Sequence, residues 1–95
     1  VYIPNVFSPN GDGLNDLFTV FAGSDVVEIK GFIIFDRWGN MLYQKGPFLP
    51  NDLQYGWDGT FEGQDMNAGV YVFYAEVVFA DGLTEVFKGD VILMR

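Results

Sequence analysis

The residues best suited to chemistry are polar side chains and glycines gathered in one short segment, Ser8 to Asp16. The segment holds four Asn or Asp side chains and two glycines at alternate positions. Such glycines allow positive φ, so the backbone can curl and aim oxygen atoms inward. Hard cations bind in oxygen cages of this kind, and we interpret Asn10, Asp12, the carbonyl of Leu14 and Asp16 as a candidate calcium site.

The match to an EF-hand loop is incomplete. The twelfth position is Phe21 instead of the bidentate Glu, and no helical pattern flanks the loop. The alternative is a turn held by hydrogen bonds from its own Asn and Asp side chains. Both interpretations stay open at this point.

A second polar segment, Asp36-Arg37-Trp38-Gly39-Asn40, separates two apolar runs. Its Gly-Asn pair is typical of a tight hairpin turn. An Arg beside a Trp can form a binding hot spot, so Arg37, Trp38 and Gly39 are candidate partner-binding residues. The structural alternative is favoured, because Trp is usually mostly buried: the indole would cover the end of the fold, and Arg37 would pair with Asp36 or Asp58.

The run before this turn is apolar without a polar break, from Phe32 to Phe35. Either Gly31 marks a bulge that shifts the register, or the strand is covered on both faces. An exposed apolar cluster around Phe32 and Ile34 would mark a partner surface, so both residues join the candidate set.

Aromatic turns allow one further site. If Trp38 and Trp57 were both exposed, they could stack on sugar rings as a carbohydrate-binding module does. Catalysis has less support, because the chain has no His and no Cys. Their absence removes the commonest general base, Ser-His triads, thiolate nucleophiles and disulfides.

The composition indicates one small domain. The chain has 95 residues, 49% of them hydrophobic and 18% aromatic, which suits a single densely packed core. The net charge of −8 and the five scattered basic residues disfavour nucleic acid and an anionic membrane surface as partners. No apolar run approaches the ~20 residues of a membrane-spanning helix. Because Val1 is not an initiator Met, we expect a fragment or a processed chain.

Short β-branched and aromatic runs alternate with Gly, Asn, Asp and Pro clusters, which predicts an all-β fold. About seven antiparallel strands are expected, as in an immunoglobulin-like sandwich. Gly46 to Tyr55 is predicted to be a long surface loop, and Ala80-Asp81-Gly82 a hairpin turn. The expected strands are Tyr2 to Phe7, Leu17 to Phe21, Val26 to Asp36, Met41 to Lys45, Gly59 to Phe61, Val70 to Phe79 and Leu83 to Met94. The expected core includes Tyr71, Phe73, Val77, Phe79, Phe87, Val91 and Leu93.

Five motifs, taken in order, resemble one family. They are Ile3-Pro4-Asn5-Val6-Phe7-Ser8-Pro9-Asn10-Gly11-Asp12-Gly13-Leu14-Asn15-Asp16, Ile34-Phe35-Asp36-Arg37-Trp38-Gly39-Asn40, Trp57-Asp58-Gly59-Thr60, Ala68-Gly69-Val70-Tyr71 and Lys88-Gly89-Asp90-Val91-Ile92-Leu93. The chain is similar, over nearly its whole length, to the gliding-motility-associated C-terminal domain. That family is the type B sorting domain of the type IX secretion system in Bacteroidota.

The resemblance implies an immunoglobulin-like domain, residues 1–95, at the C-terminus of a larger secreted protein whose N-terminal cargo it exports. It implies passage through the periplasm, recognition at the outer-membrane translocon with an SprF- or PorP-like partner, and release at the cell surface or into the medium. No enzyme activity and no membrane insertion are expected, and the only cofactor considered is calcium.

The sorting function leaves three candidate surfaces: the Asn10 to Asp16 loop, the turn at Arg37-Trp38-Gly39, and the edge of the last strand, which could accept a partner strand. Two other hypotheses are kept. One is a calcium-stabilised spacer in a surface adhesin. The other is the carbohydrate-binding module.

Overall fold

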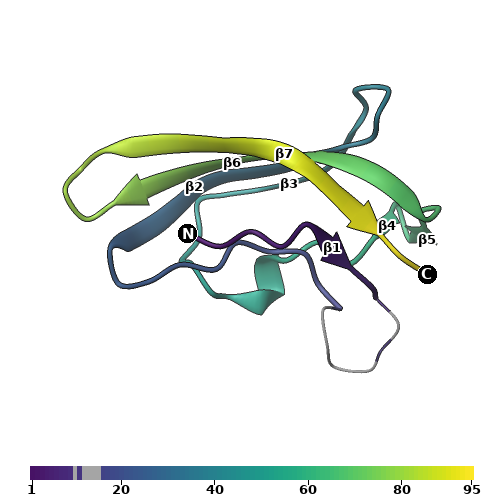
Figure 1. The fold of residues 1–95 in the computed structure, drawn as a ribbon, viewed down its shortest axis with the longest axis horizontal. Helices are drawn as coiled ribbons and strands as arrows, with labels where there is room; N and C mark the ends of the chain where they lie inside the picture. The colour runs from purple at the N-terminus through teal and green to yellow at the C-terminus, as the bar shows by residue number, and fades with distance from the viewer. Residues whose placement is uncertain (10, 12–15) are drawn as a thin grey trace.

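The computed structural model describes residues 1–9, 11 and 16–95. Its strands form a broad, curved sheet above a second layer of extended chain (Figure 1). No helix among the described residues has the length and apolarity needed to cross a bilayer. The elements are β1 (Val6–Phe7), β2 (Val26–Phe35), β3 (Met41–Lys45), the 3-10 helix η1 (Leu53–Tyr55), β4 (Thr60–Phe61), β5 (Gln64–Asp65), β6 (Gly69–Phe79) and β7 (Thr84–Leu93).

The main layer is a five-stranded sheet in the order β1-β7-β6-β2-β3. Two antiparallel hairpins, β2 with β3 and β6 with β7, supply four of these strands. β1 joins the edge in parallel, with Val6 opposite Ile92 and Phe7 opposite Leu93. β4 and β5 form a separate small hairpin, in which β5 is a strand that the sequence pattern did not predict.

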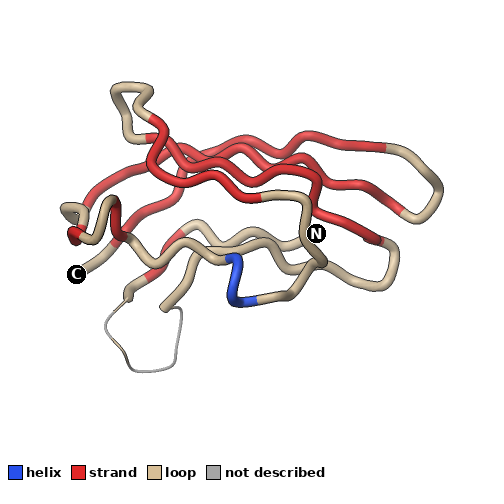
Figure 2. The backbone as a smooth tube through the Cα atoms, turned by 180° about the vertical axis from the view of Figure 1, so that it is seen from behind, coloured by secondary structure: helices blue, strands red, loops and turns tan. Residues whose placement is uncertain are grey.

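The second layer is made of extended segments that touch through single bridges instead of ladders. Tyr2 pairs with Phe21, and Phe18 pairs with Trp57. Figure 2 shows these segments as tan tube facing the red sheet. The strand predictions over Tyr2 to Phe7 and Leu17 to Phe21 are therefore largely wrong. Only Val6 and Phe7 form strand, because the chain crosses from the second layer to the sheet near the buried Pro4 and cannot pair continuously with either.

The core lies between the two layers. Alternate residues of β6 point into it, because side chains of a strand alternate between its faces. Tyr71, Phe73 and Val77 are buried, and so are Val91 and Leu93 of β7. Phe79 and Phe87 are partly buried and pack against this core. The predicted core residues are thus confirmed, and aromatic rings join the layers: Phe18 lies 5.6 Å from Phe32 and 5.5 Å from Phe73.

The structure of β2 decides between the two interpretations of its apolar run, a bulge at Gly31 or a strand covered on both faces. Its pairing with β6 shifts register between Ile29 and Gly31, so the bulge interpretation is confirmed. After the shift, Phe32 and Ile34 point into the core, while Ile33 and Phe35 face outward and are only half-buried.

The segment from Gly46 to Tyr55 is more than a surface loop. Phe48 is buried and stacks on Tyr55 at 4.9 Å between ring centres. The Asn51 side chain donates to the carbonyl of Ala22 at 2.8 Å and accepts from its N–H at 2.9 Å. Asn51 thus supplies the hydrogen bonds that a neighbouring strand would give, and it ties the loop to the second layer.

A tyrosine near the start of β6 completes the resemblance to immunoglobulin domains. The Tyr71 hydroxyl donates to the carbonyl of Asn67, four residues upstream, at 2.6 Å. Immunoglobulin-like sandwiches have such a tyrosine corner near the start of strand F, where the hydroxyl bonds the backbone a few residues upstream. The strand order β7-β6-β2 also matches the G-F-C order of these domains. The fold is an all-β, immunoglobulin-like sandwich, as predicted.

Candidate recognition surface

The turn between β2 and β3 has a fixed shape, and Asp36 is the reason. One of its carboxylate oxygens, Oδ1, accepts hydrogen bonds from the backbone N–H groups of Trp38 and Asn40, both at 2.9 Å. The other, Oδ2, accepts from the Asn40 amide at 2.8 Å. Gly39 adopts φ +87°, a conformation that glycine takes without strain. The hairpin turn predicted from the sequence is confirmed.

The charge state of Asp36 follows from these contacts. The hydrogen bond from the Asn40 side chain, helped by backbone N–H groups, holds the pKa of the Asp36 carboxyl below its ordinary value of 3.8, against a smaller opposing effect of burial. A charged carboxylate is therefore the form that holds the turn. Its hydrogen bonds are charge-assisted, which makes them stronger than neutral ones.

Trp38 stands at the tip of this fixed turn and is 79% exposed. The Arg37 guanidinium lies over its ring, 5.6 Å from the centre. The structural role favoured from residue type is therefore wrong for Trp38, since the indole does not cover the sandwich end. The predicted pairing of Arg37 is wrong too: among the described residues, the ion pairs are Lys30 with Glu76 and Arg95 with Asp65.

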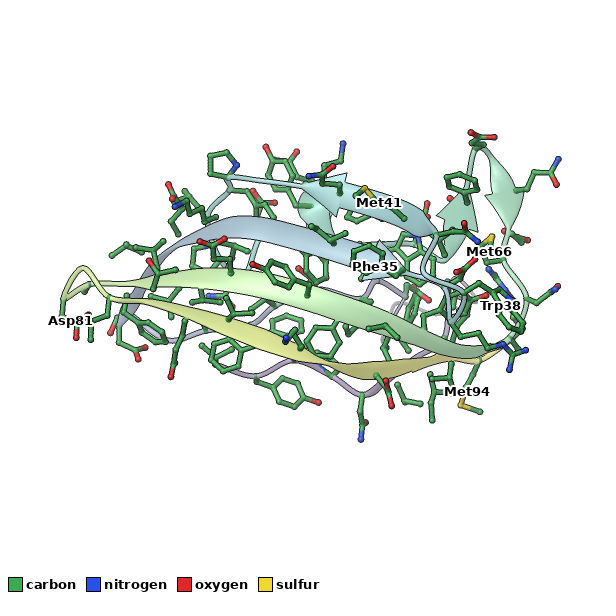
Figure 3. All side chains as sticks on the ribbon, turned by 90° about the horizontal axis from the view of Figure 1, so that it is seen from above. Phe35, Trp38, Met41, Met66, Asp81 and Met94 are labelled. Carbon is green, nitrogen blue, oxygen red and sulfur yellow. The ribbon has the colours of Figure 1, made fainter. Side chains whose placement is uncertain are left out.

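A pocket of about 170 Å³ opens beside the turn. One wall is Asp36, Arg37 and Trp38, and the other is the chain entering β6. In Figure 3, Trp38 and Met66 lie at the same end of the molecule, far from Asp81. The second wall comprises Met66, Asn67, Ala68, Gly69, Val70 and Tyr71.

Arg95 fixes the hairpin that precedes the second wall. Its guanidinium donates to the carbonyls of Gly59 at 2.7 Å and Met66 at 2.9 Å, and it lies 3.8 Å from an Asp65 oxygen. Tyr71 fixes the wall itself through its bond to the Asn67 carbonyl. Burial raises the pKa of the Tyr71 phenol, with Arg95 opposing, so the hydroxyl stays a donor. Both walls of the pocket are thus held by hydrogen bonds.

The pocket's second wall was not anticipated from the sequence. Arg95 and Met66 are 29 residues apart, and nothing local to either predicts their contact. The only available signal was the Ala68-Gly69-Val70-Tyr71 motif, which was quoted for the resemblance and not as a site.

Phe32 and Ile34 do not belong to any partner surface. Both side chains are 0% exposed and lie in the core between the layers. That prediction is wrong because the bulge before Phe32 sets which alternate residues face inward. The exposed apolar side chains near the turn are instead Met41 and Val70.

Trp57 is also completely buried. It packs 5.5 Å from Phe7 and 5.2 Å from Tyr71, and its indole N–H donates to the carbonyl of Thr60 at 2.9 Å. Stacking of a sugar on both tryptophans is therefore excluded by this structure.

Three of the four residues predicted to bind calcium, Asn10, Asp12 and Leu14, lie outside the described residues. The fourth, Asp16, accepts a hydrogen bond from the N–H of Gly11 at 3.0 Å. This bond fits a turn and says nothing about a metal. Within residues 1–9, 11 and 16–95, no three carboxylate, His or Cys side chains gather to hold an ion.

Comparison with known proteins agrees with the resemblance. A family model described as the CHU_C type IX secretion signal domain matches residues 1–93. No curated protein matches the chain closely enough to count as a relative. The matched region includes every strand of the sandwich and both walls of the pocket. A secretion-signal family is not an enzyme family, and its members are recognised by the type IX machinery and carry attached cargo out of the cell. The chain belongs to the type IX secretion signal domain family, and it acts as the sorting signal of an exported protein.

Proposed function

We propose that the folded domain is recognised at the outer membrane through its Arg37-Trp38-Gly39 turn and the adjoining pocket. The observation that carries this proposal is the exposed indole of Trp38, on a turn that three hydrogen bonds to the Asp36 carboxylate hold in shape. A large aromatic side chain presented on a rigid support loses little freedom when it binds, so Trp is enriched among binding hot spots. The Arg37 guanidinium beside it adds a donor for a carboxylate or carbonyl of the partner.

The proposed partner is an outer-membrane protein of the SprF or PorP type, reached after the chain has crossed the periplasm. In this proposal residues 1–95 are the C-terminal domain of a larger secreted protein, and the N-terminal cargo follows them to the surface or medium. The domain does no catalysis. Support comes from the family match and from the absence of His and Cys in the sequence.

The experiment is a fusion of residues 1–95 to a periplasmic reporter in a host with a type IX system. Reporter activity is measured in the medium, at the cell surface and in the periplasm. Wild-type fusion should leave the cell, whereas Trp38→Ala should hold most of it in the periplasm. Met41→Ala, which removes an exposed apolar side chain near the turn, is the matched control. If Trp38→Ala is exported as well as the control, the turn is not the recognised surface.

Calcium stays a prediction about the Asn10 to Asp16 segment. It is supported by the sequence pattern alone. Titration of calcium into the domain, with the melting temperature as readout, tests it. A rise that Asp16→Asn abolishes supports the site, and an unchanged melting temperature in saturating calcium rules it out.

A further inference from the structure

The edge of β7 offers a second surface that is independent of the turn. β7 is the outermost long strand on its side of the sheet, as Figure 3 shows. β1 covers it only at Ile92 and Leu93. The stretch from Thr84 to Asp90 therefore has β6 on one side and, among the described residues, no strand on the other.

The hydrogen-bond pattern shows which backbone groups face this open edge. The N–H of Phe79 bonds the carbonyl of Leu83, so the odd-numbered residues of β7 pair with β6. The N–H groups of Ile92 and Met94 bond the carbonyls of Asn5 and Phe7, so even-numbered residues point the other way. By the same alternation, residues 84, 86, 88 and 90 direct their N–H and C=O groups outward.

This edge is regular enough to act as a template. The β6 and β7 pairing runs from Gly69 with Leu93 to Val78 with Thr84 without a register shift. The opposite edge strand, β3, is shorter and its pairing is interrupted by a shift. Proteins usually protect an edge with charge, bulges or proline. The stretch from Thr84 to Asp90 has no bulge and no proline, and its charged side chains, Glu85, Lys88 and Asp90, are of mixed sign. Its regular backbone can therefore accept an added strand. Seven residues at ~3.3 Å each give a contact about 20 Å long.

A pocket at the hairpin end indicates the chemistry of the occupant. It has a volume of about 330 Å³ and is lined by Phe79, Asp81, Leu83, Thr84 and Glu85. Leu83 is 67% exposed, so an apolar surface and two carboxylates meet where the open edge begins. A Lys or Arg side chain has the aliphatic stem and the charged head that such a pocket fits. The net charge of −8 favours a basic occupant as well.

We propose that β7 accepts an extended strand of a partner protein along Thr84 to Asp90, with a basic side chain of that strand seated between Asp81 and Glu85. The added strand would be the sixth of the main sheet, and main-chain hydrogen bonds would give it affinity. This inference rests on the sorting function, since it takes the strand from the machinery that recognises the domain.

Proline substitution tests the backbone directly. Lys88→Pro removes an N–H that faces only the open edge, while Lys88→Ala removes the side chain and keeps that N–H. In the reporter fusion, Lys88→Pro should lower export at least tenfold and Lys88→Ala less than twofold. The melting temperature of Lys88→Pro must stay within a few degrees of wild type. Equal export of the two variants overturns the inference.

A charge variant keeps the inference testable if the proline disturbs folding. Glu85→Lys should lower export, whereas Glu62→Lys makes the same charge change on the exposed β4–β5 turn and should not. Similar effects of the two would mean that only net charge matters, which contradicts a basic side chain in the pocket. If the wild-type fusion stays in the periplasm, the proposed function itself is refuted. If the wild-type fusion and every β7 variant are exported normally, only the proposed strand addition at the β7 edge is refuted.

Hydrogen exchange of the backbone amides in residues 1–95 tests whether the β7 edge is open before any partner binds. The amides of residues 86, 88 and 90 should exchange much faster than those of 85, 87 and 89. Protection of the even-numbered set would show that the edge is already covered. If the domain dimerises in solution and Lys88→Pro makes it monomeric, the occupant is a second copy and not a partner strand.

Discussion

The two tryptophans of this domain lie in turns of similar composition and have opposite surroundings. Trp38 follows Asp36 and precedes Gly39, while Trp57 precedes Asp58 and Gly59. In both turns the Asp side chain organises the backbone: Asp58 accepts from the N–H of Thr60 at 3.0 Å, as Asp36 does from Trp38. Yet Trp38 is 79% exposed and Trp57 is 0% exposed.

The difference comes from what each turn packs against. Trp57 pairs with Phe18 in the second layer, so its ring points toward the sheet and its N–H finds the Thr60 carbonyl. Trp38 belongs to a hairpin that extends past the end of the sandwich, where Arg37 contacts its ring. The lesson is that turn chemistry sets the local backbone, while the position in the layers decides whether a ring stabilises the fold or is free to be recognised.

Removing the buried ring should have the largest effect. Trp57→Ala empties a space shared with Phe7 and Tyr71, and we expect a loss of about 3 to 5 kcal/mol in the free energy of unfolding. Urea denaturation followed by circular dichroism measures it. Because the proposed recognition requires the folded domain, export of the Trp57→Ala fusion should fail as well. A loss below about 1 kcal/mol would contradict the packing described for Trp57.

Tyr43 tests the neighbourhood of the buried tryptophan. Its hydroxyl donates to the Tyr55 carbonyl at 2.8 Å, and Tyr43→Phe should lower the free energy of unfolding by about 1 kcal/mol at neutral pH. Burial, and then the charge of Asp58, raise the pKa of Tyr43 from 10.0 to about 12.

The raised pKa sets the direction of the pH dependence for Tyr43. The neutral phenol stabilises the fold fully below pH 10.0, and this contribution is lost as the pH rises from 10.0 toward about 12. The stability difference between wild type and Tyr43→Phe should therefore narrow over that interval. An unchanged difference up to pH 12 would show that the phenol does not titrate with a raised pKa.

Asp36 tests the turn that carries the exposed tryptophan. Asp36→Asn keeps an acceptor oxygen but loses the charge, and should lower the melting temperature by a few degrees at neutral pH. Since the folded pKa lies below 3.8, the carboxylate stabilises the protein above pH 3.8, and the effect is lost as the pH falls further. The difference in melting temperature between Asp36→Asn and wild type should shrink in acid, and a difference that stays constant would contradict the role of the charged carboxylate.

Removing the exposed ring should have the smallest effect on stability. Trp38→Ala should change the free energy of unfolding by less than about 0.5 kcal/mol, because the side chain is 79% exposed. The same variant should nonetheless reduce export. In Trp57→Phe, where Trp38 is the single tryptophan, acrylamide should quench the tryptophan emission strongly. In Trp38→Phe, where Trp57 is the single tryptophan, it should quench that emission weakly. Equal quenching would remove the contrast between the two residues.

The sequence determined the all-β class, the two long hairpins and the core faces of β6 and β7, because alternation, β-branched residues and Gly-rich turns act over a few residues. The family resemblance, confirmed over residues 1–93, also came from local motifs. These are properties that neighbouring residues specify on their own.

Tertiary structure alone decided the rest. The second layer lacks the strand predicted at Leu17 to Phe21, because its pairing depends on segments that meet at single bridges. Phe32 and Ile34 turned inward because one bulge sets the parity of β2. Trp38 stayed outside while Trp57 went in, because exposure depends on the packing of layers far apart in sequence. That long-range packing is the part of the candidate site that no local pattern contains.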